Sequence, residues 1–181
     1  MKKTLKIMAV ALLALGLFAC GEKHKITVEE LREAQSTLFN ENGRLNEKEA
    51  PGVAEKYLKY VDQNPNDTAA VKWLFHAMEI NVLLKDADKS EKLCNQLLEQ
   101  YPQSKWAPMS LILLGSFVYE DMLNDTVKAH AAYQRLIDDY PESDLVDDAQ
   151  KSIEYLGLTA EERMTLMMMS KMEAQEIDEI D

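Results

Sequence analysis

Three prolines recur at a nearly fixed interval and divide the chain into segments of similar length. Pro65, Pro102 and Pro141 are separated by 37 and 39 residues. Proline lacks the backbone N–H and clashes with the preceding turn, so each of them ends a helix. The residues eight, five and four positions before each proline are almost all aromatic or aliphatic: Tyr57, Tyr60 and Val61; Cys94, Leu97 and Leu98; Tyr133, Leu136 and Ile137. Because this spacing places them on one helical face, the period predicts stacked helical hairpins.

Helix boundary signals complete the prediction of an all-α fold. Thr27 with Glu30, and Thr159 with Glu162, form capping boxes that open helices. A residue type favoured at helix N-caps stands two positions after each proline. Gly157 is a typical residue to follow a helix. We expect helices over residues 27–39, 47–63, 67–84, 87–101, 104–123, 126–140 and 143–156, and one more after Thr159.

The hairpin of residues 114–144 carries signature residues of a known repeat. Ala129, Tyr133, Leu136 and Pro141 match the second-helix signature of tetratricopeptide repeats, and Gly115 matches the first-helix signature. Over roughly residues 45–157 the chain therefore resembles tetratricopeptide-repeat proteins. Its Tyr-Pro-x-Ser steps are similar to those of bacterial envelope proteins, namely the outer-membrane β-barrel assembly lipoprotein and the Tol–Pal periplasmic coordinator. The resemblance implies a tetratricopeptide-like stack of antiparallel helical hairpins, an α-solenoid.

The start of the chain has the layout of an export signal. A basic start precedes an apolar core at residues 7–18, which is too short to span a bilayer in the mature protein. Residues 17–20 resemble a lipobox, and this resemblance makes Cys20 the acylated first residue of a lipoprotein. Gly21, rather than Asp, follows the cysteine, which in this family implies export to the outer membrane. The alternative is a plain signal peptide followed by an unmodified Cys20.

These signals divide the chain into four parts. We expect a lipoprotein signal peptide at residues 1–19, a tether at 20–25, a helical-repeat domain at 26–157, and a capping helix with an acidic tail at 158–181. A terminal repeat needs a covering element, so the last helix is expected to cover the final hairpin. Alternatively, its methionines form an adaptable docking surface. They are Met164, Met167, Met168, Met169 and Met172.

The sequence shows no assembled catalytic or metal centre. There is no nucleophile elbow and no phosphate-binding loop. His76 and Glu79 could share a helical face, but two groups are too few for a strong metal signal. Residues 86–90 begin like a calcium loop, yet Glu91 stands where glycine is required. We therefore expect no enzyme activity, no metal and no cofactor.

Buried positions can also be assigned from the repeat. Cys94 occupies the position equivalent to Tyr133 and is expected to be buried rather than reactive. With Cys20 acylated, two cysteines provide no disulfide framework. Trp73 and Trp106 are interpreted as core anchors rather than as ligand platforms.

Charge limits the choice of partner. The formal net charge is −12, which disfavours nucleic acids and anionic lipid surfaces. The same charge would favour basic segments of partner proteins, but general solubility is the simpler explanation for it.

The resemblance places a partner-binding groove on the first helix of each hairpin. Counted from Gly115, its positions are Lys72, Phe75, Glu79, Val82, Met109, Ile112, Ser116, Tyr119, Lys151 and Tyr155. The apolar members could instead belong to the core between helices.

The leading hypothesis is a non-enzymatic scaffold that is anchored to the outer membrane and faces the periplasm. It would present this groove to an envelope protein or an extended peptide segment. By resemblance, β-barrel assembly or a related envelope task is the expected process. The alternative is a ligand-capture or accessory lipoprotein of an uptake or secretion system. A lipid-anchored enzyme is a third hypothesis, and it would require titratable groups to converge from several helices.

Overall fold

The computed structural model describes residues 24–178, and every regular element in this range is a helix. The elements are α2 (Val28–Ser36), α3 (Ala50–Gln63), α4 (Ala70–Leu83), α5 (Ala87–Gln100), α6 (Trp106–Leu113), the π-helix η2 (Leu114–Met122), α7 (Thr126–Asp139), α8 (Val146–Tyr155) and α9 (Ala160–Asp178). The all-α prediction is confirmed. The expected signal peptide, Cys20 and most of the tether lie outside the described residues.

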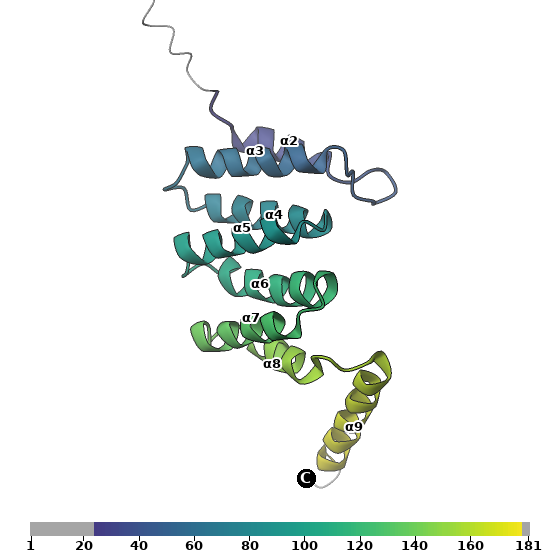
Figure 1. Cartoon of the computed structure of the whole chain (residues 1–181). Helices are drawn as coiled ribbons and strands as arrows, with labels where there is room; N and C mark the ends of the chain where they lie inside the picture. Colours follow the sequence, from purple (N-terminus) through teal and green to yellow (C-terminus); the bar gives the residue numbers. More distant parts are fainter. Residues whose placement is uncertain (1–23, 179–181) are drawn as a thin grey trace, which may run out of the picture.

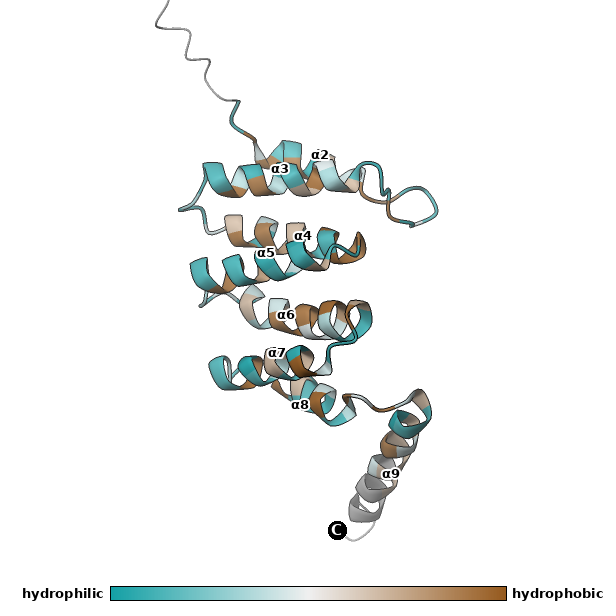
Figure 2. Ribbon diagram, viewed as in Figure 1, coloured by the Kyte–Doolittle hydropathy of each residue, from teal (hydrophilic) through white to brown (hydrophobic). Residues whose placement is uncertain are grey.

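The helices form a stack of hairpins (Figure 1). In chain order, α2 pairs with α3, α4 with α5, and α6 continued by η2 with α7, while α8 packs on α7. Apolar residues dominate α4 and α6, whereas polar residues are prominent on α5 and α7 (Figure 2). The first helix of each inner hairpin lies between neighbouring helices, so it buries more of its circumference than the second helix does.

The steps between hairpins repeat the same backbone geometry. Asn64, Tyr101 and Tyr140 end α3, α5 and α7 with φ of −134°, −134° and −133° and ψ of 56°, 50° and 55°. Each of these residues precedes a proline, which disfavours the α-helical conformation of the residue before it. The proline period therefore sets three nearly identical helix ends, as the sequence predicted.

The helix starts partly differ from the expectation. The capping box at Thr27 and Glu30 is confirmed, and so are the reciprocal hydrogen bonds of Thr159 and Glu162. After each proline, however, the helix begins two or three residues later than expected. Asp67, for example, accepts a hydrogen bond from the backbone N–H of Ala69 at 2.8 Å, two residues on. The polar side chain thus stabilises a turn that precedes the helix, rather than capping the helix itself.

One repeated position of the second helices lies at the centre of the core. Tyr57, Cys94 and Tyr133 are all fully buried, as the period predicted. The thiol of Cys94 lies 3.5 Å from the hydroxyl oxygen of Ser110, and burial raises the pKa of this thiol to about 11. Trp73 is also buried and packs 4.9 Å from the ring centre of Tyr57. Trp106 is only partly buried.

The first helix of the third hairpin differs from the sequence prediction. A single α-helix was expected over residues 104–123, but the second half is the π-helix η2. Gly115 lies in η2, and a Cβ atom at this position would come within 2.5 Å of the Tyr133 ring. The hydroxyl groups of Tyr133 and Ser116 are 2.8 Å apart, and the Tyr133 hydroxyl also donates to Glu120 at 3.1 Å. The wider turn of a π-helix therefore accommodates this large buried side chain and satisfies its hydroxyl.

The last helix does not cover the final hairpin, which corrects the sequence expectation. Figure 1 shows α9 leaving the stack after α8, and its five methionines between residues 164 and 172 are each 47–64% exposed. The start of α9 is tied to the stack: Arg163 pairs with Glu120 at 2.8 Å and donates to the carbonyl of Leu158. Met164, Met167, Met168 and Met172 recur at the spacing of one helical face, yet all four remain exposed rather than packed on α8. Within residues 24–178, no helix is both long enough and apolar enough to cross a membrane.

We predict that Gly115→Ala destabilises the protein. The added methyl group would collide with the buried ring of Tyr133, so the free energy of unfolding should fall by about 1–3 kcal/mol. Chemical denaturation measures the change. Gly52→Ala is the matched control, since a Cβ there meets nothing within 4 Å, and it should raise stability by up to about 1 kcal/mol. Equal effects of the two substitutions would contradict the packing described here.

We also predict that Cys94 reacts slowly with a polar maleimide in the folded protein. With Cys20 replaced by alanine, Cys94 is the one cysteine left in the chain. Burial and the raised pKa both reduce the accessible thiolate, so labelling at neutral pH should be at least about tenfold slower than in denaturant. Equally fast labelling in the native and denatured states would refute the burial.

Candidate partner-binding face

The first helices α2, α4, α6–η2 and α8 together form what we call the first-helix face. The ten groove positions expected on it divide into three groups. Phe75, Val82 and Tyr119 are buried, Lys72, Met109 and Lys151 are exposed, and Glu79, Ile112, Ser116 and Tyr155 are intermediate.

The expectation of an accessible groove position was therefore wrong for Phe75, Val82 and Tyr119. The ring of Phe75 packs against that of Trp106, with 4.7 Å between their centres. The ring of Tyr119 lies beneath the ammonium group of Lys128 on α7, at 5.2 Å. These contacts join helices within and between hairpins, so the three side chains serve the core.

The structure does not gather the remaining positions into one groove. Glu79 lines a cleft between α2, α4 and η2, together with the edge of buried Val82. Met109 lines a hollow between two proline turns, while Ser116 and Tyr155 line a third, near Arg163. Lys72, Ile112 and Lys151 line none of these three.

The cleft between α2, α4 and η2 is the best-formed apolar site on the first-helix face. We call it the aromatic cleft. It has a volume of about 340 Å³ and is lined by Gln35, Leu38, Phe39, Tyr57, His76, Glu79, Ile80, Val82, Leu83, Leu113 and Phe117. Three large apolar side chains around it remain in contact with solvent: Phe39 is 50% exposed, Leu83 52% and Phe117 48%. Three successive hairpins contribute to one apolar surface that nothing among residues 24–178 covers.

Sequence reasoning missed all three exposed residues. Phe117 was missed because the groove positions were counted along an uninterrupted α-helix, whereas η2 has a wider turn. Phe39 was expected inside the first helix, but it follows the end of α2 and pairs with Leu45 in an isolated β-bridge. Leu83 is the last residue of α4, one position beyond Val82, the last groove position expected on this helix. An apolar residue at a helix end, next to a turn, was the available signal for Leu83.

Polar groups in the aromatic cleft are few and close together. A ring nitrogen of His76 lies 2.5 Å from the carboxylate of Glu79, one turn later on α4. Tyr57 reaches the cleft from α3, and its enclosed hydroxyl has no hydrogen-bond partner in the described part of the chain. Burial, together with the negative charge of Glu79, raises the pKa of Tyr57 to about 12, so the hydroxyl is a neutral donor. A buried polar group without a partner typically costs about 1–3 kcal/mol.

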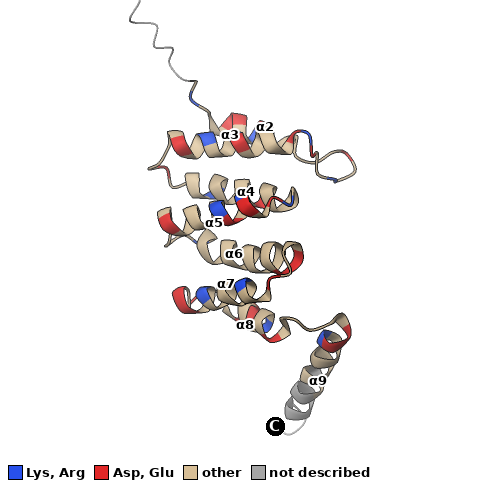
Figure 3. Ribbon diagram, in the orientation of Figure 1, with Lys and Arg blue, Asp and Glu red and all other residues tan. Residues whose placement is uncertain are grey.

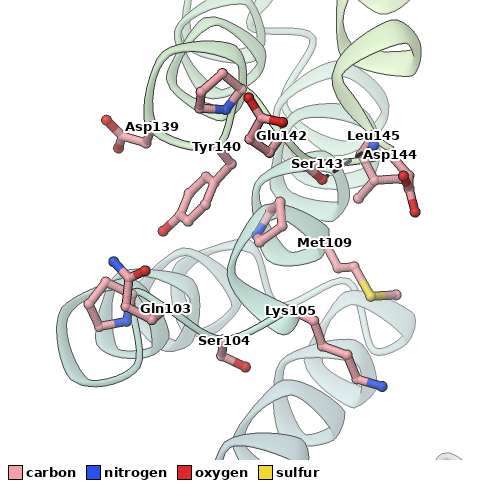
Figure 4. A pocket seen from close by; sticks show the side chains of 13 residues that line it. Gln103, Ser104, Lys105, Met109, Asp139, Tyr140, Glu142, Ser143, Asp144 and Leu145 are labelled. Carbon is pink, nitrogen blue, oxygen red and sulfur yellow. Dashed lines mark hydrogen bonds between the residues drawn. The ribbon is translucent and has the colours of Figure 1, made fainter.

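The hollow that contains Met109 is a general feature of the stack. It has a volume of about 700 Å³ and lies between the turns that start at Pro102 and Pro141 (Figure 4). A comparable hollow of about 350 Å³, lined by Pro65 and Tyr101, lies one step earlier. Because consecutive proline turns produce such a hollow repeatedly, its presence alone does not indicate a ligand.

The third hollow has a volume of about 190 Å³, and an ion pair forms between two of the residues that line it. Arg163 at the start of α9 pairs with Glu120 of η2 beside Ser116 and Tyr155. The arrangement ties α9 to the stack.

Acidic side chains occur on every hairpin of the stack (Figure 3). Within the described residues, no group of three or more His, Cys, Asp and Glu side chains is placed to hold a metal ion. The pair of His76 and Glu79 remains a contact of two residues on one helix.

Comparison with known proteins identifies the repeats. The tetratricopeptide repeat family model matches residues 74–104 and 111–143, which correspond to most of α4–α5 and of α6–η2–α7. No curated protein matches the chain. Tetratricopeptide repeats typically bind protein or peptide partners, which makes protein–protein interaction the general role that the matched repeats suggest. Residues 74–104 and 111–143 therefore match tetratricopeptide repeats, and they lie within an all-α stack of helical hairpins.

Proposed function

We propose that this protein is a non-enzymatic scaffold, anchored to the outer membrane through an acylated Cys20, which binds an envelope protein on its first-helix face. The observation that carries the proposal is the aromatic cleft, where Phe39, Leu83 and Phe117 remain exposed on a tetratricopeptide stack. Exposed apolar clusters of this kind mark interaction sites. β-Barrel assembly or a related envelope task is the proposed process, and it rests on the Tyr-Pro-x-Ser resemblance.

The anchor would set where the cleft acts. Cys20 lies only a few residues before Ile26, which is buried against the first hairpin. A tether this short would hold the stack close to the membrane surface. A partner that reaches the cleft would then be a membrane-associated protein, or a segment extending from one.

Photo-cross-linking in cells tests the proposed face. A photoreactive residue at position 83 or 117 should yield a discrete adduct with an envelope protein, because both side chains border the aromatic cleft. The same residue at position 127 is the matched control, since Val127 is 79% exposed on α7 and lines none of the described clefts. Adducts are identified by mass spectrometry.

Two outcomes would decide against the proposal. Identical adducts from all three positions would show contact without a defined face, and no adduct from positions 83 and 117 would remove the cleft as an interface. An adduct with a component of an uptake or secretion system would support the proposed interface but indicate a role in that system instead of β-barrel assembly. Polar substitution of Phe75 or Tyr119 is unsuitable here, because both are buried and their loss would act on folding.

The anchor has its own prediction. Cys20→Ser should release the protein from the outer-membrane fraction, because stable anchoring requires acyl chains. Cell fractionation followed by immunoblotting measures the distribution. Cys94→Ala, which removes a buried thiol, should leave the distribution unchanged. Retention of the Cys20 variant in the outer membrane would argue against a lipoprotein.

A further inference from the structure

The aromatic cleft requires a large apolar side chain from its ligand. Phe39, Leu83 and Phe117 come from three hairpins, and each is about half exposed. A single aromatic or long aliphatic side chain between them would contact all three at once. The volume of about 340 Å³ suits one or two side chains of an extended segment, rather than a whole helix.

The charge of the cleft limits what can stand beside that apolar side chain. Among the described residues that line the cleft, Glu79 is the one acidic residue, and none is a lysine or arginine. Its side chain is 41% exposed, and His76 contacts one of its two carboxylate oxygens. The other oxygen can accept a hydrogen bond from a cation. The net charge of −12 acts in the same direction, since it attracts basic segments and repels acidic ones.

The hydroxyl of Tyr57 indicates a third feature of the ligand, a hydrogen-bond acceptor. It is an enclosed, neutral donor that lacks an acceptor in the described part of the chain. The ring centre of Tyr57 lies 6.5 Å from that of His76, which contacts Glu79, so the hydroxyl and the carboxylate belong to one polar cluster. If the partly exposed Glu79 side chain turns toward a bound cation, a backbone carbonyl of the same ligand can reach the hydroxyl. Extended segments present such carbonyls, whereas helices use theirs internally.

We propose that the aromatic cleft binds an extended protein segment that places one large apolar side chain between Phe39, Leu83 and Phe117 and an adjacent Lys or Arg on Glu79. A backbone carbonyl of this segment accepts a hydrogen bond from Tyr57. The inference deepens the proposed function, on which it rests, by stating the chemistry of the partner. A second copy of this chain fits less well: α9 carries exposed methionines, but they lie in an α-helix, whose backbone carbonyls are used internally.

Binding of a peptide panel to the purified full chain tests the inference. Fluorescent peptides of about twelve residues in a glycine–serine–threonine background carry Phe, Leu or Ala next to Lys, Gln or Glu. Fluorescence anisotropy should show the tightest binding for Phe–Lys and Leu–Lys. The corresponding Glu peptides should bind at least about tenfold more weakly because of repulsion from Glu79, and the Ala peptides should show little binding.

Variants of the cleft should separate the three contributions. Glu79→Gln should weaken the Lys peptides about fivefold to tenfold and leave the Gln peptides unchanged. Phe117→Ser should weaken Lys and Gln peptides alike, by about tenfold. Tyr57→Phe should weaken binding severalfold without lowering Tm, because the hydroxyl has no partner in the free protein. Val127→Ser, distant from the cleft, is the control for both measurements.

Absence of binding across the panel, or a preference for Lys that survives Glu79→Gln, would overturn the inference. Peptide-independent self-association lost on Phe117→Ser would overturn it as well, in favour of a second copy as the occupant. These failures are distinct from failure of the proposed function. The cross-links from positions 83 and 117 would persist in the first case and be missing in the second.

Discussion

The stack depends on how each hairpin encloses one side chain of its second helix. Tyr57, Cys94 and Tyr133 occupy the same repeat position and are fully buried, yet each has a different environment. Tyr133 fits because Gly115 removes a Cβ that would strike its ring, and η2 satisfies its hydroxyl. Cys94 is small and lies against Ser110 of the next hairpin. Because the position is close-packed, a change in the size of its side chain must be matched on the facing helix.

Much of the architecture could be predicted because it follows from local chemistry. A proline restricts the backbone of the residue before it, so the helix ends at Tyr101 and Tyr140 could be predicted. A threonine three residues before a glutamate forms a local capping box, so the start of α2 at Thr27 could be predicted as well. The π-helix could not, because nothing in the pattern of residues 114–122 separates it from an α-helix. The contacts that η2 makes with Tyr133 lie across the hairpin, beyond the reach of a local sequence pattern.

The candidate site was less predictable for the same reason. Counting positions from the buried Gly115 did not separate buried from exposed side chains: Tyr119 lies in the core, whereas Phe117 lies on the surface. Phe75 was misplaced because burial at that position depends on Trp106 of the following hairpin. The direction of α9 depends equally on long-range contacts, since the pair of Arg163 and Glu120 fixes only its first turn. A family pattern therefore predicts which helices line the proposed face, but not which of their side chains are exposed on it.

Tyr57 connects the core to the cleft. Cys94 at the equivalent position shows that this position can be filled without a hydroxyl, and the hydroxyl of Tyr133 is satisfied by its neighbours. The hydroxyl of Tyr57 therefore lowers the stability of the free protein with no compensating hydrogen bond in the described residues. A ligand that supplies the missing acceptor would remove this penalty on binding. Because ligand binding and folding are linked, such a ligand would stabilise the hairpins around Tyr57 beyond the contribution of its apolar contacts.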